Sequence, residues 1–253
     1  LRRALAGVIR PSDLVGRSLG RFAEPAACLI SPGILGHDPG RRHGRALSVD
    51  EARAGLREAG IDESLVLRAA VHPLIRDRYG SLLSALFSTW AELGIVIEVV
   101  TPDTQTFRAA MENNANIDVF ISRFGPDYHD PDTFTRALFH SADGEYRAYY
   151  SSPQADELLE SARSETQPQA RERLYRDFEN LLRESDALLP LFHDVDYRVA
   201  SPKVRGLRLI GRAPNANYAE LGKAETAAAA ETHAAEKKGI LQVPMTAGIS
   251  GLD

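Results

Sequence analysis

The sequence has little cysteine and tryptophan, no long apolar run and no large excess of one charge. Cys28 is the only cysteine among 253 residues, which excludes an internal disulfide and a zinc site of the CxxC type. No run of roughly eighteen apolar residues occurs, so no membrane-spanning helix is predicted. Thirty basic against thirty-five acidic residues leave a net charge of -5. Without a strong basic field, we expect no nucleic-acid partner.

The two ends of the chain differ in character from the rest. An amphipathic helical pattern already begins at Leu1 without a capping residue, so we expect the start to be a cut edge. Residues 223–238 are rich in Ala, Glu and Lys, a composition typical of a semi-rigid linker. Residues 239–253 begin with an apolar stretch that predicts a new strand. We therefore expect a piece of a longer protein.

Alternating strand and helix signals fill the first half of the chain. Ser48 and Glu51 match a capping box, which predicts a helix ending near Gly60. The apolar pattern predicts further elements, in chain order a strand at 65–71, a helix at 73–93, a strand at 95–100 buried on both faces, a helix at 105–113 and a strand at 118–122. This order predicts an α/β fold with a largely parallel sheet.

Other segments are predicted from caps, prolines and apolar stripes. Ser12 and Asp13 can cap a short helix, and residues 20–46 read as a long irregular connection. Ser152 before Pro153 predicts the start of a helix, and Pro168 opens another. Short strands are expected at 188–192, 196–200 and 204–210.

The segment best suited to ligand chemistry follows the strand at 118–122. Ligands in open α/β sheets bind beyond the carboxyl ends of the strands, where residues 122–134 lie. Asp127 can supply negative charge for an ammonium group, and the neighbouring aromatic side chains can line a pocket. The alternative is a solvated turn, because Asp, Gly and Pro are also the residues that turns require.

Several short motifs in order resemble one protein family. Residues 124–131 read FGPDYHDP and resemble the Trp-x-x-Asp-Tyr-x-Asp-Pro motif of the family 5 solute-binding proteins, the peptide- and oligopeptide-binding receptors of bacterial ABC importers. Further matches to that family are the runs LRRAL at residues 1–5, IRPSDLV at 9–15, ISPGILG at 30–36, YSSPQAD at 150–156 and LPLFH at 189–193. The resemblance covers most of residues 1–222.

The resemblance implies a fold and a set of ligand contacts. It implies a periplasmic-binding-protein-like fold of type II, with residues 1–222 as the C-terminal lobe. Asp127 would pair with the α-amino group of a ligand, and Phe124 and Tyr128 would form walls. Arg123 is a weaker candidate for a ligand carboxylate. Phe124 replaces the usual tryptophan of the motif, which leaves the finer ligand preference open.

The same resemblance implies partners and a location. We expect a non-enzymatic monomer without a cofactor that closes on short peptides or other amine-bearing solutes outside the cytoplasm, with an ABC permease in the cytoplasmic membrane as partner. Residues 239–253 resemble the first strand of the family, so a second binding module can begin there. The alternative function is a ligand-sensing domain within a larger signalling protein.

Rival sites are less consistent with their surroundings. Ser18 lies in a G-x-S-x-G pattern, but a predicted helix rather than a strand precedes it. Asp127, His129, Asp130 and Asp132 match neither the EF-hand nor the HExxH spacing, so no metal site is predicted there.

Other conspicuous residues have structural interpretations. His193 and Asp194 resemble a catalytic dyad, but we expect a structural histidine. Cys28 is expected to be a small loop or core residue, and Trp90 is expected in the core. The charged helix around Arg171, with Glu179, is expected to be a solvated face.

Overall fold

The computed structural model describes residues 1–101, 103–113, 116–195, 197–210 and 216–224. Among these, Leu1–Tyr197 and Ile210 form one compact unit, and Arg198–Leu209 with residues 216–224 form a second. Lys223 is part of a strand, β7 (Gly222–Lys223). Ala224 of the predicted linker is described as well, and its amide donates to the carbonyl of Lys203 at 2.7 Å. The linker from residue 225 on and the predicted terminal strand lie outside the described residues and stay predictions.

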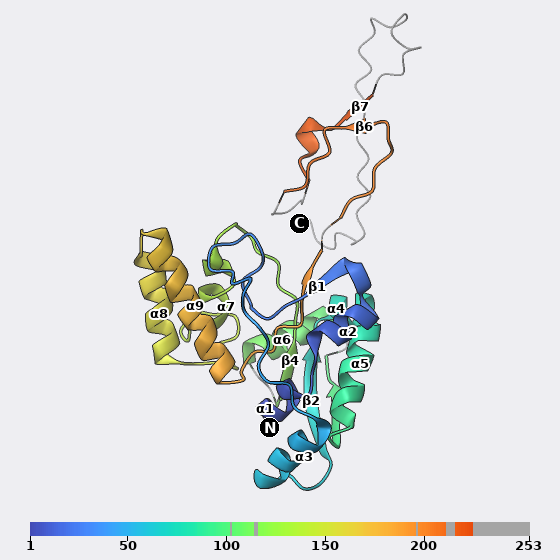
Figure 1. Ribbon diagram of the computed structural model, residues 1–253, viewed down its shortest axis with the longest axis vertical. Coiled ribbons are helices and arrows are strands. Elements are labelled where there is room, and N and C mark those ends of the chain that lie inside the picture. The colour runs from blue at the N-terminus through green and yellow to red at the C-terminus, as the bar shows by residue number, and fades with distance from the viewer. Residues whose placement is uncertain (102, 114–115, 196, 211–215, 225–253) are drawn as a thin grey trace, which may run out of the picture. The chain divides into compact units, whose positions relative to one another are not determined.

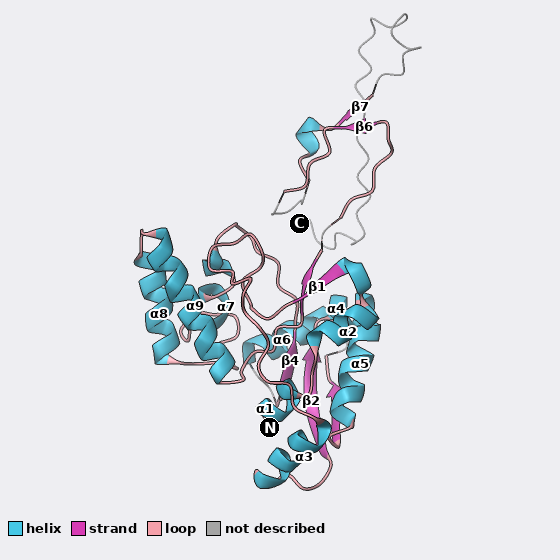
Figure 2. Ribbon diagram, viewed as in Figure 1, coloured by secondary structure: helices cyan, strands magenta, loops and turns pink. Residues whose placement is uncertain are grey.

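A sheet of three parallel strands forms the centre of the first unit. The strand β2 (Leu65–Val71) lies between β3 (Ile95–Val99) and β4 (Val119–Ile121), as Figure 2 shows in magenta. In the pairing register, Leu65 lies opposite Ile95, and Ala69 lies opposite Val119. These strands and the helices between them confirm the predicted α/β class.

The prediction that the strand at 95–100, which is β3 in the structure, is buried on both faces was wrong. Ile95 in β3 is buried, but Val96 is 53% exposed and Val99 is 41% exposed. The strand is an edge strand of the described sheet. The face of Val96 and Glu98 is exposed, and on the opposite face burial decreases from Ile95 to Val99. An apolar run alone therefore did not identify burial of both faces.

Six helices precede or connect the strands in the sequence up to Asn113. They are α1 (Arg2–Gly7), α2 (Pro11–Ser18), α3 (Val49–Glu58), α4 (Pro73–Arg78), α5 (Gly80–Ala91) and α6 (Thr104–Asn113). The capping box of α3 is confirmed, because the Glu51 amide donates to Ser48 Oγ at 3.2 Å and the Ser48 amide donates to Glu51 Oε2 at 2.8 Å. Gly60 follows with a φ of +76°, as the end of such a helix requires.

Two helix predictions need correction. Residues 73–93 form two helices rather than one, because Tyr79 leaves the helical conformation and its side chain reaches Asp194, to which its hydroxyl donates at 2.6 Å. The helix α2 begins at Pro11, which occupies its first turn, so Ser12 and Asp13 lie inside the helix and do not cap it.

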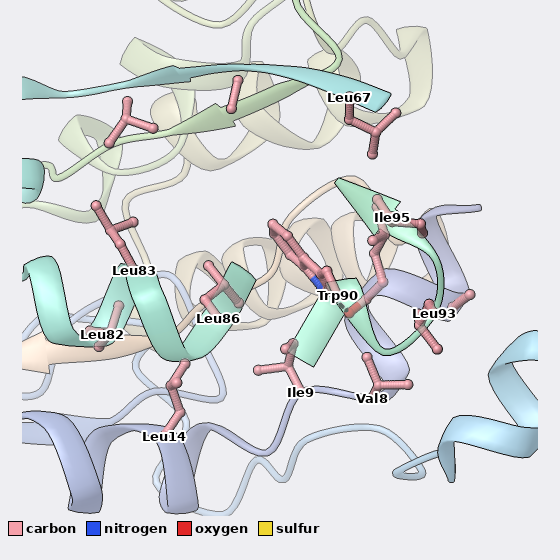
Figure 3. Close-up of a cluster of buried hydrophobic side chains, with 14 of the residues drawn as sticks. Val8, Ile9, Leu14, Leu67, Leu82, Leu83, Leu86, Trp90, Leu93 and Ile95 are labelled. Carbon is pink, nitrogen blue, oxygen red and sulfur yellow. Dashed lines mark hydrogen bonds between the residues drawn. The ribbon is translucent and has the colours of Figure 1, made fainter. Parts of the chain in front are cut away.

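The largest hydrophobic cluster lies between the sheet and the first five helices. Four side chains on one face of α5 are buried there, namely Leu82, Leu83, Leu86 and Trp90, each at most 6% exposed. Figure 3 shows these side chains together with Val8 and Ile9 from the N-terminal segment. Trp90 Nε1 also donates to the carbonyl of Leu5 at 3.0 Å, so the predicted core position of this tryptophan is confirmed.

A second cluster forms around the helices after the sheet. These helices are α7 (Arg136–Phe139), α8 (Pro153–Ser164) and α9 (Pro168–Glu184), and Figure 1 shows α8 and α9 side by side. The predicted cap of α8 is confirmed, since the Ala155 amide donates to Ser152 Oγ at 3.3 Å. Tyr175 and Phe178 of α9 are fully buried in this cluster.

The connection predicted at 20–46 contains regular structure and is tied to α9. It begins with a 3₁₀ turn, η1 (Gly20–Phe22), and β1 (Ala23–Pro25), which pairs antiparallel with β5 (Phe192–Asp194). Farther along, the amides of Leu29 and Ile30 donate to Glu179 Oε1 at 2.5 and 3.1 Å. Glu179 is 4% exposed, so the expectation that it belongs to a solvated face was wrong.

The remaining predicted strands are shorter than expected. The strand predicted at 188–192 is displaced to β5, and the described residues at 197–200 form no strand. In the second unit, β6 (Val204–Arg205) pairs antiparallel with β7, and a 3₁₀ turn spans Tyr218–Glu220. Among the described helices, none combines the length and apolar character needed to cross a membrane.

Candidate functional site

The predicted ligand-binding segment leaves the sheet at the carboxyl ends of its parallel strands. The His72 amide, directly after β2, donates to the carbonyl of Ile121 at 2.9 Å, so β2 and β4 end side by side. Thr101, after β3, meets them there, because its hydroxyl accepts from the Val71 amide at 2.9 Å. Residues 122–130 therefore start at the sheet edge where α/β proteins place their ligands.

Asp127 is exposed in this segment and lacks a cationic partner. No hydrogen bond or ion pair joins it to another residue in the described part of the chain. Its charge acts instead on a second acid: burial raises the pKa of Glu145, and the negative charge of Asp127 raises it further. The two acids form a region of negative electrostatic potential that a cation would stabilise. Sequence reasoning missed Glu145, which lies in no recognised motif.

The two aromatic residues predicted as walls differ in burial. Phe124 is half-buried against the second cluster, and its ring lies edge-on to Phe134 with 5.7 Å between the centroids. Tyr128 is 47% exposed, and its hydroxyl donates to Asp132 Oδ2 at 3.2 Å. Phe124 is therefore held in place by packing, while Tyr128 is held mainly through its hydroxyl.

Arg123 already has an acidic neighbour. Its Nη2 lies 3.6 Å from Asp194 Oδ2, the same oxygen that accepts from the hydroxyl of Tyr79. The guanidinium remains 42% exposed. A ligand carboxylate would therefore compete with Asp194 for Arg123.

The other polar residues of the motif have structural partners. Asp130 accepts two hydrogen bonds from Arg171, with Oδ2 to Nη1 at 2.7 Å and Oδ1 to Nη2 at 2.9 Å. It also caps the 3₁₀ turn η2 (Pro131–Thr133), and His129 Nε2 lies 3.1 Å from the carbonyl of Gly33. Asp130 thus joins the loop to α9, and Arg171 is not merely part of a solvated face.

The rival sites fit structural roles. Ser18 ends a helix and is followed by the 3₁₀ turn η1, so it lacks the strand-to-helix setting of a nucleophile elbow. His193 and Asp194 have different partners, since His193 Nδ1 lies 3.5 Å from Ser31 Oγ whereas Asp194 accepts from Tyr79. Gly36, the last residue of the run ISPGILG, also has a structural role. Its φ is +90°, and a Cβ at this position would lie 3.1 Å from Tyr175 Cβ.

Two hollows in the described residues are lined by residues other than the predicted ligand contacts. One of about 560 Å³ is lined by residues of the loop after β1 and of α9, including Asp38, Arg41 and Arg173. Another of about 550 Å³ is lined by residues that include Arg2, Tyr149 and Leu181. Neither is lined by Phe124, Asp127 or Tyr128.

The fold of this chain resembles that of a solved structure. The solved structure of HbpA2 from Haemophilus parasuis matches with a TM-score of 0.75 at 20% identity, covering 88% of this chain and 44% of that one. This likeness shows the α/β fold of the type II periplasmic binding proteins, as the sequence predicted.

Two curated relatives of Escherichia coli strain K12 match over parts of their length. The periplasmic murein peptide-binding protein MppA is 23% identical over 211 residues, covering 81% of this chain and 39% of the relative. The periplasmic oligopeptide-binding protein OppA is 25% identical over 158 residues, covering 62% and 29%. The chain thus spans well under half the length of these relatives.

The family assignment rests on a match over more than half of the chain. The family described as "Bacterial extracellular solute-binding proteins, family 5 Middle" matches residues 1–146, which include the sheet, the first six helices and the FGPDYHDP motif. The chain therefore belongs to the family 5 bacterial extracellular solute-binding proteins.

Proposed function

We propose that the chain forms the C-terminal lobe of a receptor that binds short peptides or related amine-bearing solutes. The observation that carries this proposal is the exposed carboxylate of Asp127, which has no cationic partner in the described residues and lies near a second acid, Glu145. A ligand ammonium group would supply the missing positive charge. An ammonium–carboxylate hydrogen bond in a closed cleft is stronger than a neutral one.

The neighbours of Asp127 determine how such a ligand would lie. Phe124, fixed against Phe134, offers a flat apolar surface, and Tyr128 adds a second aromatic side chain. Arg123 would bind a ligand carboxylate only by drawing its guanidinium away from Asp194. The α-amino group therefore contributes more to recognition than the carboxylate, because Asp127 has no partner to give up.

Closure of two lobes around the ligand completes the proposed mechanism. The carboxylate of Asp127 is exposed, and an ion pair in open solvent contributes at most about 1 kcal/mol. A second lobe closing over this surface would exclude water and strengthen the contact. Relatives named as periplasmic peptide-binding proteins support a location outside the cytoplasm. Delivery of the ligand to an ABC permease is part of the same proposal.

A thermal-unfolding screen of the complete gene product tests this proposal. The protein is unfolded and refolded to remove bound ligand, then heated with di- to pentapeptides in free and N-acetylated form. Free peptides that bind should raise the melting temperature, since ligand at 100 times its Kd stabilises by about 2.7 kcal/mol. N-acetylated peptides should not, because they lack the ammonium group.

Two matched variants separate the role of Asp127 from a general effect of charge. Asp127→Asn should lose the stabilisation by free peptides, whereas Asp62→Asn, the same substitution at an exposed loop position, should keep it. Equal stabilisation of the wild type by free and acetylated peptides would remove Asp127 from the role of ammonium anchor.

A further inference from the structure

Three side chains of metal-binding type meet on the first unit, and none of them is a predicted ligand contact. They are Cys28, His37 and His193, and one ligand atom of each lies within 4.8 Å of the others. Within the described ranges, no other group of three or more such side chains lies close enough together to hold an ion. The four motif residues Asp127, His129, Asp130 and Asp132 do not form one.

The fold, rather than a spacing motif, brings these residues together. Cys28 and His37 belong to the loop after β1, and His193 is the middle residue of β5. The antiparallel pairing of β1 and β5 places Glu24 opposite His193, and the Ala26 amide extends it by donating to the carbonyl of Leu191 at 3.1 Å. The paired strands therefore hold the start of the loop beside His193.

The distances fit a small tetrahedral ion. Cys28 Sγ lies 3.3 Å from His37 Nδ1. A sulfur and a nitrogen bound to one zinc ion at about 2.3 and 2.0 Å are separated by about 3.5 Å when the angle is tetrahedral. The pair therefore already has the spacing of two zinc ligands. The ring centroid of His193 lies 6.0 Å from that of His37, and a ligand atom of His193 lies within 4.8 Å of those of Cys28 and His37.

The group is buried, and one of its nitrogen atoms makes no hydrogen bond within the described residues. Cys28 is 5% exposed, and Nε2 of His193 is buried without a hydrogen-bond partner. Burial, with the nearby His37, lowers the pKa of His193 to about 4, so its imidazole is neutral at neutral pH, the form that binds metals. A buried polar atom without a partner costs free energy, which coordination would offset.

The donor set selects the kind of ion. One sulfur and two imidazole nitrogens suit Zn²⁺, whereas Ca²⁺ and Mg²⁺ require oxygen ligands. Burial and the charge of Glu179 raise the pKa of the Cys28 thiol to about 11, so the metal-free thiol is protonated. Coordination would release that proton to solvent, as zinc does with thiol ligands. His37 would exchange the contact of Nδ1 with the Ile30 carbonyl, at 2.8 Å, for the metal and carry its proton on Nε2.

We propose that Cys28, His37 and His193 bind one Zn²⁺ ion that fastens the loop after β1 to β5, with water as the fourth ligand. The site is separate from Asp127 and does not depend on the proposed peptide binding. The ion would hold the loop to β5, and the same loop also packs on α9 through Glu179.

Cobalt spectroscopy of the 253-residue chain, prepared without a histidine tag and stripped with a chelator, tests the site. Co²⁺ should produce a thiolate-to-cobalt charge-transfer band and intense tetrahedral visible bands at one equivalent per chain, and Zn²⁺ should displace it. Cys28→Ser should abolish the charge-transfer band. His37→Gln and His193→Gln should each weaken Zn²⁺ binding by roughly 100-fold or more, since even outer-shell partners contribute about 10- to 100-fold.

His129→Gln is the matched control, because it removes an exposed histidine outside the group and should leave zinc binding unchanged. Circular dichroism of the metal-free variants verifies folding, and Cys28→Ala replaces Cys28→Ser if the latter does not fold. The proposal is overturned if the wild type shows no charge-transfer band or if the Cys28 variant keeps it. An equal loss of Zn²⁺ affinity in His129→Gln and His193→Gln would overturn it as well.

Discussion

At the residue scale, the negative charge of Asp127 raises the pKa of Glu145. Burial already disfavours the ionised form of Glu145, and the carboxylate of Asp127 disfavours it further. A like charge raises the pKa of a carboxyl group only when it lies close by. The part of this raised pKa that Asp127 causes reflects the negative potential that the proposed ammonium group would meet.

Asp127→Asn should lower the pKa of Glu145 toward its ordinary value without restoring it fully, because burial remains. An NMR titration of the Glu145 side chain measures this change. Asp62→Asn should leave the pKa of Glu145 where it is in the wild type. An unchanged value in Asp127→Asn would show that the two acids do not interact.

The raised pKa of Glu145 also has a consequence for stability. A carboxyl group whose pKa is higher in the folded state than in the unfolded state favours folding most below the unfolded value, and this advantage is lost as the pH rises through the folded value. Glu145→Gln should therefore remove part of the decline in unfolding free energy above about pH 4.3. Urea unfolding over a pH series measures it, and parallel pH profiles for variant and wild type would contradict this account.

At the element scale, the capping box fixes the start of α3. Ser48→Ala should lower the unfolding free energy by about 1 kcal/mol, because the Glu51 amide loses its acceptor. Ser84→Ala, at an exposed position within α5, should change it by less than about 0.5 kcal/mol. Urea unfolding compares the two variants, and equal effects would show that the cap contributes nothing specific.

The pair of Asp130 and Arg171 joins the motif loop to α9. Burial alone would raise the pKa of Asp130, but the hydrogen bonds from Arg171 outweigh it and hold that pKa below its ordinary value. Asp130→Asn should therefore destabilise the protein by about 2 kcal/mol at pH 7, since the pair is partly buried. The difference between variant and wild type should shrink as the pH falls below about 4, where Asp130 begins to take up a proton.

An exposed ion pair serves as the comparison for Asp130. Glu160→Gln removes a partner of Arg136 at a position that is 49% exposed, and should cost at most about 1 kcal/mol. If Asp130→Asn costs no more than Glu160→Gln in denaturant unfolding, the loop is not held by Arg171.

Elements specified by neighbouring residues were predictable from the sequence. The capping box of Ser48 and the Ser152 cap depend on contacts within three residues, and the strand β2 was visible as a local apolar run. The break at Tyr79 and the burial of Glu179 depend on Asp194 and on the amides of Leu29 and Ile30, which are distant in the sequence. Patterns along the chain carry no information on such contacts.

The candidate site shows the same limit. The motif indicated Asp127, but not its neighbour Glu145 or the contact between Arg123 and Asp194. The group of Cys28, His37 and His193 could not be predicted from the sequence either, because it forms only when β1 pairs with β5. Each of these juxtapositions is a product of tertiary structure.

At the scale of the whole molecule, the hydrophobic clusters lie within the first unit. All three consist of residues from Ala4 to Phe192. Because those clusters supply most of the stabilising apolar burial, a chain ending at Tyr197 should still unfold cooperatively. Its melting temperature should lie within about 4 °C of that of the 253-residue chain, equivalent to about 1 kcal/mol.

Calorimetric scanning compares the two lengths of chain. A broad, non-cooperative transition for residues 1–197 would show that residues beyond Tyr197 are required for the fold of the first unit.

The central claim, that Asp127 anchors the ammonium group of a ligand, is tested most directly by a double-mutant cycle in calorimetry. The tightest peptide from the screen and its N-acetylated form are titrated into the complete gene product, as wild type and as Asp127→Asn. We predict a coupling free energy of about 2 kcal/mol or more between the ligand amine and Asp127, as for close charge pairs in desolvated interfaces. A coupling free energy below about 0.5 kcal/mol, within the error of additivity, would contradict the account.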